Sequence, residues 1–182
     1  MAEPDPTDGL LDELRRWAAD EEVAHRARSR SRARWLRQQV AESATLTGVL
    51  LDLAERRAVV TIDATGWALT GRLLAVSTGL CVLDEIDDDE HRLALVALPA
   101  VTVVVPPVEA LGDRVPNLRL DLAGALAGLA ADRPRVCLEV MGGKKVTGVL
   151  ESVGVDVVLM RVERTSDAVV QLAISAICAC LV

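Results

Sequence analysis

The stretch VTGVLESVGVDVVLM at residues 146–160 has a close counterpart in LTGRLLAVSTGLCVL at residues 69–83. Each begins with a hydrophobic residue and Thr-Gly, continues with alternating apolar residues, and reaches a second apolar run after a turn of small residues. Alternating apolar residues predict a strand with one buried face, and a short turn between two such runs predicts a hairpin. The same pair of strands is therefore written twice in one chain.

The repetition extends to both sides of this hairpin. A helix pattern at residues 43–57 (SATLTGVLLDLAERR) recurs at 121–133 (DLAGALAGLAADR), and each copy is followed by a short strand, AVVTID or RVCLEV. Beyond the hairpin, LALVALPAVTVV at 93–104 matches VVQLAISAICAC at 169–180. A period this long in only two copies is typical of a duplicated domain. Each copy is predicted to be a helix followed by five short strands.

The repeat divides the chain into four segments. We expect a charged helical segment at 1–43, the first repeat at 44–107, a proline-containing linker at 108–120 and the second repeat at 121–182. The linker assignment follows from the stretch PPVEALGDRVPNLRL at 106–120, which carries three of the seven prolines.

Composition limits the class of protein. Hydrophobic residues make up 51% of the chain, Phe and Tyr are absent, and the formal net charge is −7. A packed globular protein is expected, and an acidic chain is a poor general coat for nucleic acid. The start has no pattern of a signal peptide and no long apolar run predicts a membrane span, so we expect a cytoplasmic protein without membrane contact. The Ala-, Arg- and Val-rich usage suggests a GC-rich bacterial genome.

The N-terminal segment has an uneven charge. Residues 1–24 contain eight acids, whereas residues 25–39 contain six arginines and no acid. At helical spacing, one stripe on this segment carries a set of arginines, namely Arg26, Arg30, Arg34 and Arg37. The stripe is a candidate contact for phosphates or for a protein partner. The alternative, which we favour, is a solvated helix whose arginines pair with the nearby acids.

The two repeats resemble the Sm-like family of small β-barrels, the LSm and Hfq type. The resemblance lies in a Gly-x-Leu-x-x-Val run that follows the first hairpin, at Gly71–Val76 and again at Gly148–Val153. It implies two tandem five-stranded, bent antiparallel barrels, each preceded by a short helix, in a mainly β protein with helices. It also implies that Gly71 and Gly148 bend the second strand where a Cβ would clash. In that family the fourth and fifth strands pair between neighbouring barrels. The two copies here are therefore expected either to pair with each other or to pair with copies in other chains, and self-association through strand edges is expected.

The residues through which such proteins bind RNA are not carried over. The positions after the second strand are Ser77–Cys81 and Gly154–Val158, and the positions between the fourth and fifth strands are Leu98-Pro99 and Ile174-Ser175. These stretches offer no aromatic side chain for base stacking and no arginine for phosphate.

Other candidate sites are weak. The acidic run DEIDDDEHR at 84–92 lacks calcium-loop spacing and is expected to form a charged hairpin tip. Cys178 and Cys180 are expected to be buried thiols, because one Cys-x-Cys is too little for zinc. Lys144 and Lys145 are expected on an exposed hairpin, where they are further candidate contacts for nucleic acid or a partner. We find no catalytic constellation, and we expect no metal and no cofactor.

The sequence leads us to expect one of two functions. The favoured one is a non-catalytic scaffold or adaptor that assembles through strand edges and recruits a protein partner through its N-terminal helix. The alternative is an RNA- or DNA-binding regulator that uses the arginine stripe, with nucleic acid the less supported partner.

Overall fold

The computed structural model describes residues 6–87, 90–107, 110–162 and 168–182. The chain divides into two compact units, residues 1–43 and residues 44–182. Within the first unit the described residues form one helix of 37 residues, α1 (Pro6–Glu42), as the sequence predicts for this segment. Residues 88–89, at the tip of the predicted acidic hairpin, and residues 1–5 lie outside the described residues.

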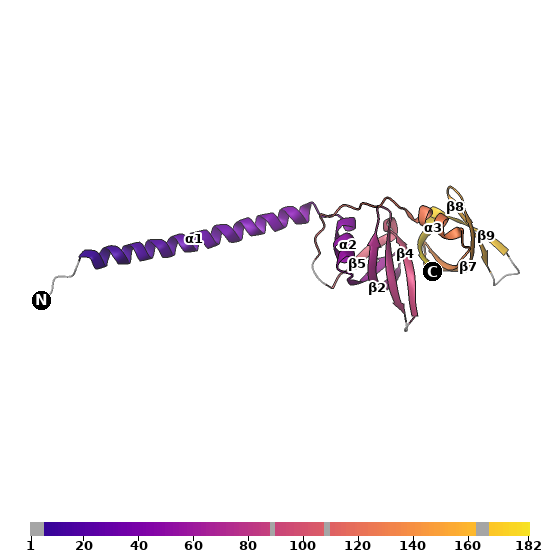
Figure 1. Ribbon diagram of the computed structural model, residues 1–182, viewed down its shortest axis with the longest axis horizontal. Coiled ribbons are helices and arrows are strands. Elements are labelled where there is room, and N and C mark those ends of the chain that lie inside the picture. The colour runs from indigo at the N-terminus through magenta and orange to yellow at the C-terminus, as the bar shows by residue number, and fades with distance from the viewer. Residues whose placement is uncertain (1–5, 88–89, 108–109, 163–167) are drawn as a thin grey trace. The chain divides into compact units, whose positions relative to one another are not determined.

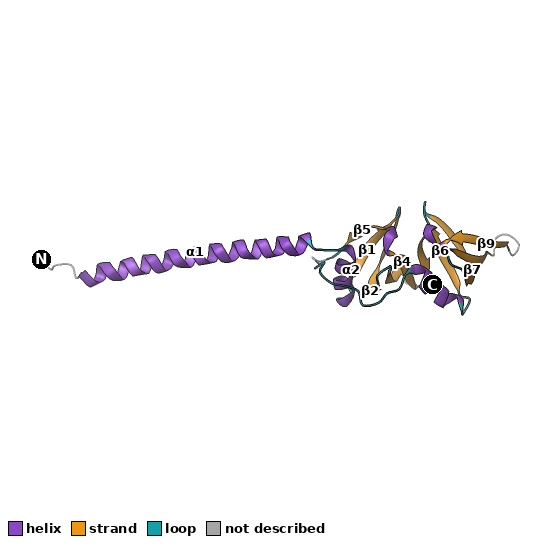
Figure 2. Ribbon diagram, turned by 90° about the horizontal axis from the view of Figure 1, so that it is seen from above, coloured by secondary structure: helices purple, strands orange, loops and turns teal. Residues whose placement is uncertain are grey.

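The second unit is mainly β with two short helices, which confirms the predicted class (Figures 1 and 2). In its first part the elements are α2 (Leu46–Glu55), β1 (Val59–Ala64), β2 (Trp67–Val76), β3 (Leu80–Asp87), β4 (Glu90–Ala97), the 3-10 turn η1 (Leu98–Ala100) and β5 (Val101–Val105). In its second part they are α3 (Leu122–Ala130), β6 (Arg135–Val140), β7 (Lys144–Val153), β8 (Val157–Val162), β9 (Ala168–Ala173), η2 (Ile174–Ala176) and β10 (Ile177–Leu181). We call these parts the first half and the second half.

The ten strands form one antiparallel sheet in the order β5-β1-β2-β3-β4-β10-β6-β7-β8-β9. Within this order each half keeps its own five strands together, with its first strand between its second and its fifth. One of the two expected pairings of the strand edges is therefore present within the chain. The hydrogen-bonded ladder continues from β4 of the first half into β10 of the second, so the halves share one continuous sheet.

The pairing registers of the two halves correspond strand by strand. In the first half Asp63 on β1 lies opposite Ala68 on β2, and in the second half Glu139 on β6 lies opposite Lys145 on β7. The irregularities recur as well. The pairing between β2 and β3 shifts between Leu73 and Ala75, and the pairing between β7 and β8 shifts between Leu150 and Ser152. A bulge kept at the same place is a specific feature of a strand rather than noise.

The same comparison holds for the fifth strand of each half. Along β1, the partner on β5 passes from Val103 to Val101, so Thr102 is skipped. Along β6, the partner on β10 passes from Ala179 to Ile177, so Cys178 is skipped. Residues of the first half thus have counterparts 76 or 77 positions later in the second.

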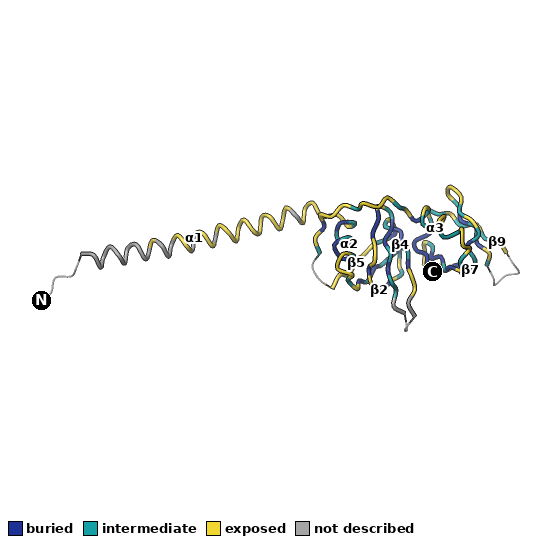
Figure 3. The backbone as a smooth tube through the Cα atoms, in the orientation of Figure 1, coloured by how far each residue is buried: buried dark blue, intermediate teal, exposed yellow. Residues whose placement is uncertain are grey.

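Each half buries the apolar side of its short helix against its strands (Figure 3). Leu50 and Leu53 of α2 are fully buried, as is Leu126 of α3. Both helices begin with a side-chain cap, because Thr45 accepts a hydrogen bond from the Gly48 amide at 3.0 Å and Asp121 accepts one from the Gly124 amide at 2.8 Å.

The described part of the predicted linker, residues 110–120, is hydrogen-bonded to the first half. The Leu111 amide donates to the Asp52 carboxylate at 3.0 Å, and the Gly112 carbonyl accepts from the Thr45 amide at 3.0 Å. Further along, the Ser77 hydroxyl donates to the Leu120 carbonyl at 2.6 Å. Its composition predicts a spacer, but these bonds hold its described ends against the first half.

Candidate functional site

The junction between the halves is a strand-to-strand contact. Ala179 and Cys180 on β10 lie opposite Val96 and Leu95 on β4. The ladder ends in a pair of backbone hydrogen bonds between Leu93 and Val182, with nitrogen–oxygen distances of 3.3 and 2.9 Å. Because antiparallel pairs alternate, the backbone groups of Leu95 and Cys180 also face each other across the junction.

The end strands of the sheet, β5 and β9, are the counterparts of the junction strands β10 and β4, but each has one neighbouring strand. In the described part of the chain, β5 pairs with β1 alone and β9 pairs with β8 alone. The difference shows in exposure. Val103 and Val105 on β5 are 48% and 58% exposed, whereas their counterparts Ala179 and Leu181 on β10 are 0% and 7% exposed.

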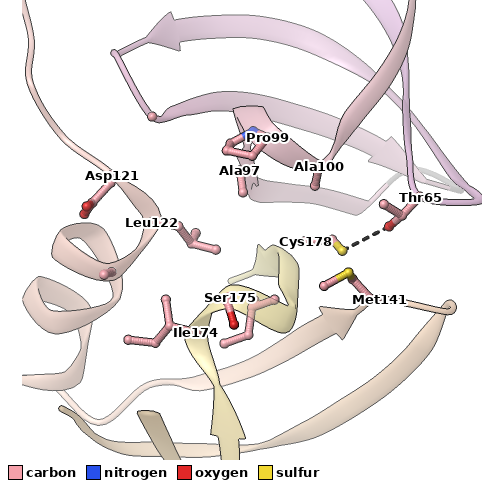
Figure 4. Close-up of a pocket in the computed structure, with 13 residues that line it drawn as sticks. Thr65, Ala97, Pro99, Ala100, Asp121, Leu122, Met141, Ile174, Ser175 and Cys178 are labelled. Atoms are coloured by element: carbon pink, nitrogen blue, oxygen red, sulfur yellow. Dashed lines mark hydrogen bonds between the residues drawn. The ribbon is translucent and has the colours of Figure 1, made fainter. Parts of the chain in front are cut away.

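The turn between β1 and β2 also reaches the second half. Thr65, with φ of 51°, lies in this turn, and its hydroxyl is 3.0 Å from the Cys178 sulfur (Figure 4). Cys178, Cys180 and Cys81 are buried and Cys137 is partly buried, all with free thiols. Burial raises the pKa of Cys81 and of Cys180 to about 12, so both stay protonated at neutral pH.

A cavity of about 490 Å³ opens beside this contact, at the start of α3 and next to both 3-10 turns (Figure 4). Its lining is mostly small and apolar, including Pro99, Leu122 and Ile174. The charged group on its wall is Asp121, whose carboxylate already caps α3. Besides Asp121, its polar side chains are the hydroxyls of Thr65 and Ser175.

A buried carboxylate lies beside the same junction. Glu139 on β6 is only 2% exposed, and within the described residues neither of its side-chain oxygens has a hydrogen bond. Lys145 forms an ion pair with it at 3.5 Å. The same ammonium lies 5.3 Å from the centre of the Trp67 ring, which belongs to the first half. One lysine therefore links the acid of its own half to an aromatic ring of the other.

Burial dominates the titration of Glu139. Desolvation raises the pKa of its carboxyl above the ordinary value, and the positive charge of Lys145 partly opposes this shift. The negative charge of Glu85, on β3 of the first half, raises the pKa further. Sequence reasoning missed Glu139. The one available signal was an acid inside the otherwise apolar strand RVCLEV.

The arginine stripe lies on α1, and all four of its arginines are exposed. Arg26 forms an ion pair with Glu22, and the neighbouring Arg28 forms one with Glu21 at 2.6 Å. Arg30 donates to the Arg26 carbonyl at 3.3 Å. The acids thus engage the start of the basic segment, whereas Arg34 and Arg37 lie further along the helix.

The remaining candidates lie in the second unit. Lys144 and Lys145 are both exposed at the start of β7. Gly71 and Gly148 are buried where the second strand of each half approaches the third, and a Cβ there would lie 2.5 Å from the Asp84 carbonyl oxygen or 2.3 Å from that of Arg161. Much of the acidic run expected as a hairpin tip is strand instead, since β3 extends to Asp87 and β4 begins at Glu90.

Among the residues that the structure describes, no three His, Cys, Asp or Glu side chains gather as metal ligands would. None of the helices in this described part is long and apolar enough to cross a lipid bilayer. A scan against family models and a search of curated proteins found no match to the chain.

Proposed function

We propose that the protein is a non-catalytic scaffold or adaptor that assembles with copies of itself through the edges of β5 and β9. The observation that carries this proposal is the β4–β10 junction, where one half already pairs its fourth strand with the fifth strand of the other. The strands equivalent to β4 and β10 in the opposite halves, β9 and β5, are the two end strands of the sheet. A contact that joins the halves can therefore be repeated between chains.

Exposed strand edges favour such assembly. An unpaired edge offers a row of backbone donors and acceptors, and soluble proteins usually protect it with charges, prolines or a covering segment. β5 has the sequence VTVVV and contains no charged residue. Head-to-tail contacts between different edges produce either a closed ring or an open filament, depending on the rotation between neighbours.

We further propose that each half is a bent barrel of the Sm-like type. The strand order within each half, the bulge at the same place on the second strand and the Gly-x-Leu-x-x-Val runs all support this assignment. A protein partner is proposed to bind α1, where Trp17, Trp35 and Leu36 are 67%, 61% and 49% exposed. Exposed tryptophan is more common at protein contacts than on inert surface.

The mass of the full chain in solution tests the assembly. We expect light scattering to report an oligomer whose population rises with concentration. Gln171→Pro should reduce it to the monomer, because by alternation the Gln171 amide points to the open side of β9 and proline cannot donate there. Gln171→Ala keeps the amide and is the matched control. A wild-type chain that remains monomeric up to high micromolar concentration would contradict the proposal.

Nucleic-acid binding by the arginine stripe is the second candidate. It is favoured by the exposed arginines at the end of α1, where residues 30–37 hold four arginines and no acid. The test is binding of a generic single-stranded RNA by the full chain at low and moderate salt, compared with Arg30→Gln, Arg34→Gln and Arg37→Gln combined. Salt-sensitive binding that the triple variant loses supports this function, and no binding at low salt eliminates it.

A further inference from the structure

The junction inside the chain predicts the register of the junction between chains. β9 is the counterpart of β4, and β5 is the counterpart of β10, each 76 residues apart from its equivalent. Applying the observed β4–β10 register to these edges gives three expected pairs. They are Val103 with Leu172, Val104 with Gln171, and Val105 with Val170.

One backbone contact cannot be repeated. Within the chain, the Val182 amide donates to the Leu93 carbonyl at 2.9 Å. The counterpart of Val182 is Pro106, which has no amide hydrogen. The ladder between copies is therefore one hydrogen bond shorter than the ladder inside the chain, and side chains have to contribute more to its register.

The side chains beside the two junctions differ in an informative way. Inside the chain, the Trp67 ring of the first half contacts the Lys145 ammonium of the second half. Lys145 also forms the ion pair with Glu139 of its own half. The strand registers show which residues replace these three at the free ends. Lys144 is the counterpart of Trp67, Ala68 of Lys145, and Asp63 of Glu139.

Inside the chain, the cation Lys145 and the acid Glu139 lie on the same side of the junction. At the free ends, the cation Lys144 would lie on the opposite side from the acid Asp63. At the free end, the acid Asp63 has Ala68 rather than a lysine as its cross-strand neighbour. The position that would reach toward it from the next copy carries Lys144. Lys144 and Lys145 are the only lysines in the chain. Within the described residues, neither Asp63 nor Lys144 has a side-chain hydrogen bond or ion pair.

We infer that Lys144 of one copy forms an ion pair with Asp63 of the next copy and thereby fixes the direction and register of assembly. This inference rests on the proposed assembly through β5 and β9. A second difference favours it, because the counterpart of Glu85, which repels Glu139 inside the chain, is the uncharged Val162. The junction between copies therefore joins an acid to a cation without the opposing carboxylate.

Charge reversal tests the pair in the full chain. Asp63→Lys places two cations at the junction between identical copies, and Lys144→Glu places two acids there. Each variant alone should raise the dissociation constant of the assembly about tenfold or more, because an attractive pair becomes a repulsive one. Asp132→Lys, an exposed reversal after α3, is the matched control and should leave the constant unchanged.

Mixing the two variants gives a sharper readout. A Lys144→Glu copy presents Glu to the lysine at position 63 of an Asp63→Lys copy, while the second junction of that pair keeps the natural Lys144 and Asp63. Every contact between unlike copies is then complementary, and every contact between like copies is repulsive. An equimolar mixture should regain wild-type affinity and contain the two variants in strict alternation, measured by native mass spectrometry.

The outcomes distinguish a failure of the proposed assembly from a failure of the Lys144–Asp63 pair. If the wild type is monomeric, the proposed assembly fails. If the wild type assembles but the single reversals do so equally well, assembly stands and the Lys144–Asp63 pair is wrong. Failure of the mixture to regain affinity, when both variants have wild-type circular dichroism and thermal unfolding, would also overturn the pair.

Discussion

β5 and β10 are equivalent strands of the two halves, but they have different neighbours in the sheet. Both pair with the first strand of their own half in the same register, and both skip one residue at the same place. β10 also pairs with β4, and all five of its residues are buried. β5 has no second neighbour in the described part of the chain, and its residues are exposed or only partly buried. The comparison teaches that burial here is decided by the next half along the sheet and not by the strand itself.

The largest expected effect comes from placing a charge on the covered strand. Ala179→Glu puts a carboxylate into a site that is fully buried and adjacent to Glu139, so the free energy of unfolding should fall by about 3–5 kcal/mol. Val103→Glu introduces the same carboxylate at the matched uncovered position, where we expect less than about 1 kcal/mol even with Asp63 opposite. Urea unfolding of both variants measures the difference.

This pair of variants also separates stability from assembly. Val103→Glu should leave the unfolding of the isolated chain almost unchanged while weakening self-association, because its side chain would enter the proposed junction. Equal destabilisation by the two variants would contradict the view that β5 is uncovered.

The next effect concerns the glycines that both halves share. Gly71→Ala and Gly148→Ala each bring a Cβ within 2.5 Å of a backbone carbonyl oxygen, which forces the second and third strands apart. We expect a loss of about 2 kcal/mol in each variant, measured by thermal unfolding. Gly128→Ala in α3 is the control, since nothing lies within 4 Å of its new Cβ and alanine favours helix. A loss in one half but not the other would show that the two halves tolerate strand separation differently.

The third effect tests a contact in the described part of the first half that has no side-chain equivalent at the matching position of the second. Asp52 in α2 is buried and accepts the Leu111 amide from the segment that crosses this half, while Arg56 lies 2.7 Å away. The corresponding position in α3 is Gly128, which has no side chain to hold such a segment. Asp52→Ala removes the buried, charged acceptor of the Leu111 amide and should cost about 2 kcal/mol.

The pH dependence of this site has a defined sign. The hydrogen bond from Leu111 and the charges of Arg56 and Arg114 hold the pKa of the Asp52 carboxyl below its usual value, although burial opposes them. The stabilisation is therefore present above the ordinary aspartate pKa and is lost as pH falls through the lowered value. Thermal unfolding at neutral and acidic pH should show the Asp52→Ala deficit shrinking in acid, and a deficit independent of pH would count against it.

Sequence patterns predicted the duplicated strands because apolar alternation and short turns of small residues are local features. They left open whether the strand edges pair within the chain or between chains, because backbone edges carry no residue-specific code. Asp63 and Glu139 illustrate the limit. Each is an acid in the same place of the same strand pattern, yet Asp63 is partly exposed and Glu139 is buried, since only Glu139 faces another half.

The segment at residues 110–120 was equally hard to predict. Pro116 and the two prolines before the segment predict a spacer, and residues 110–120 indeed contain no helix or strand. Its attachment depends on Asp52, which is 59 residues away from Leu111 and looks like an ordinary polar residue on an apolar helix. Contacts between residues this far apart leave no trace in local spacing.

The smallest effect concerns Glu139 and Asp63 themselves. Burial raises the pKa of the Glu139 carboxyl, so the folded chain favours its protonated form more than the unfolded chain does. The free energy of unfolding should consequently fall as pH rises from the ordinary glutamate pKa through the raised value. Glu139→Gln removes this decline, and at neutral pH it should stabilise the chain by about 1 kcal/mol, because the buried charge has no hydrogen bond to lose.

Asp63→Asn is the matched control in the other half, where the carboxylate is only partly buried and we expect a stability profile parallel to that of the starting protein. Both variants are made in the Gln171→Pro background, so that self-association does not add to the apparent stability. Urea unfolding across the acidic to neutral range measures the profiles. If Glu139→Gln also ran parallel to its parent, the junction between the halves would have to admit enough water to solvate the acid, and the contrast between a covered and an open strand would weaken with it.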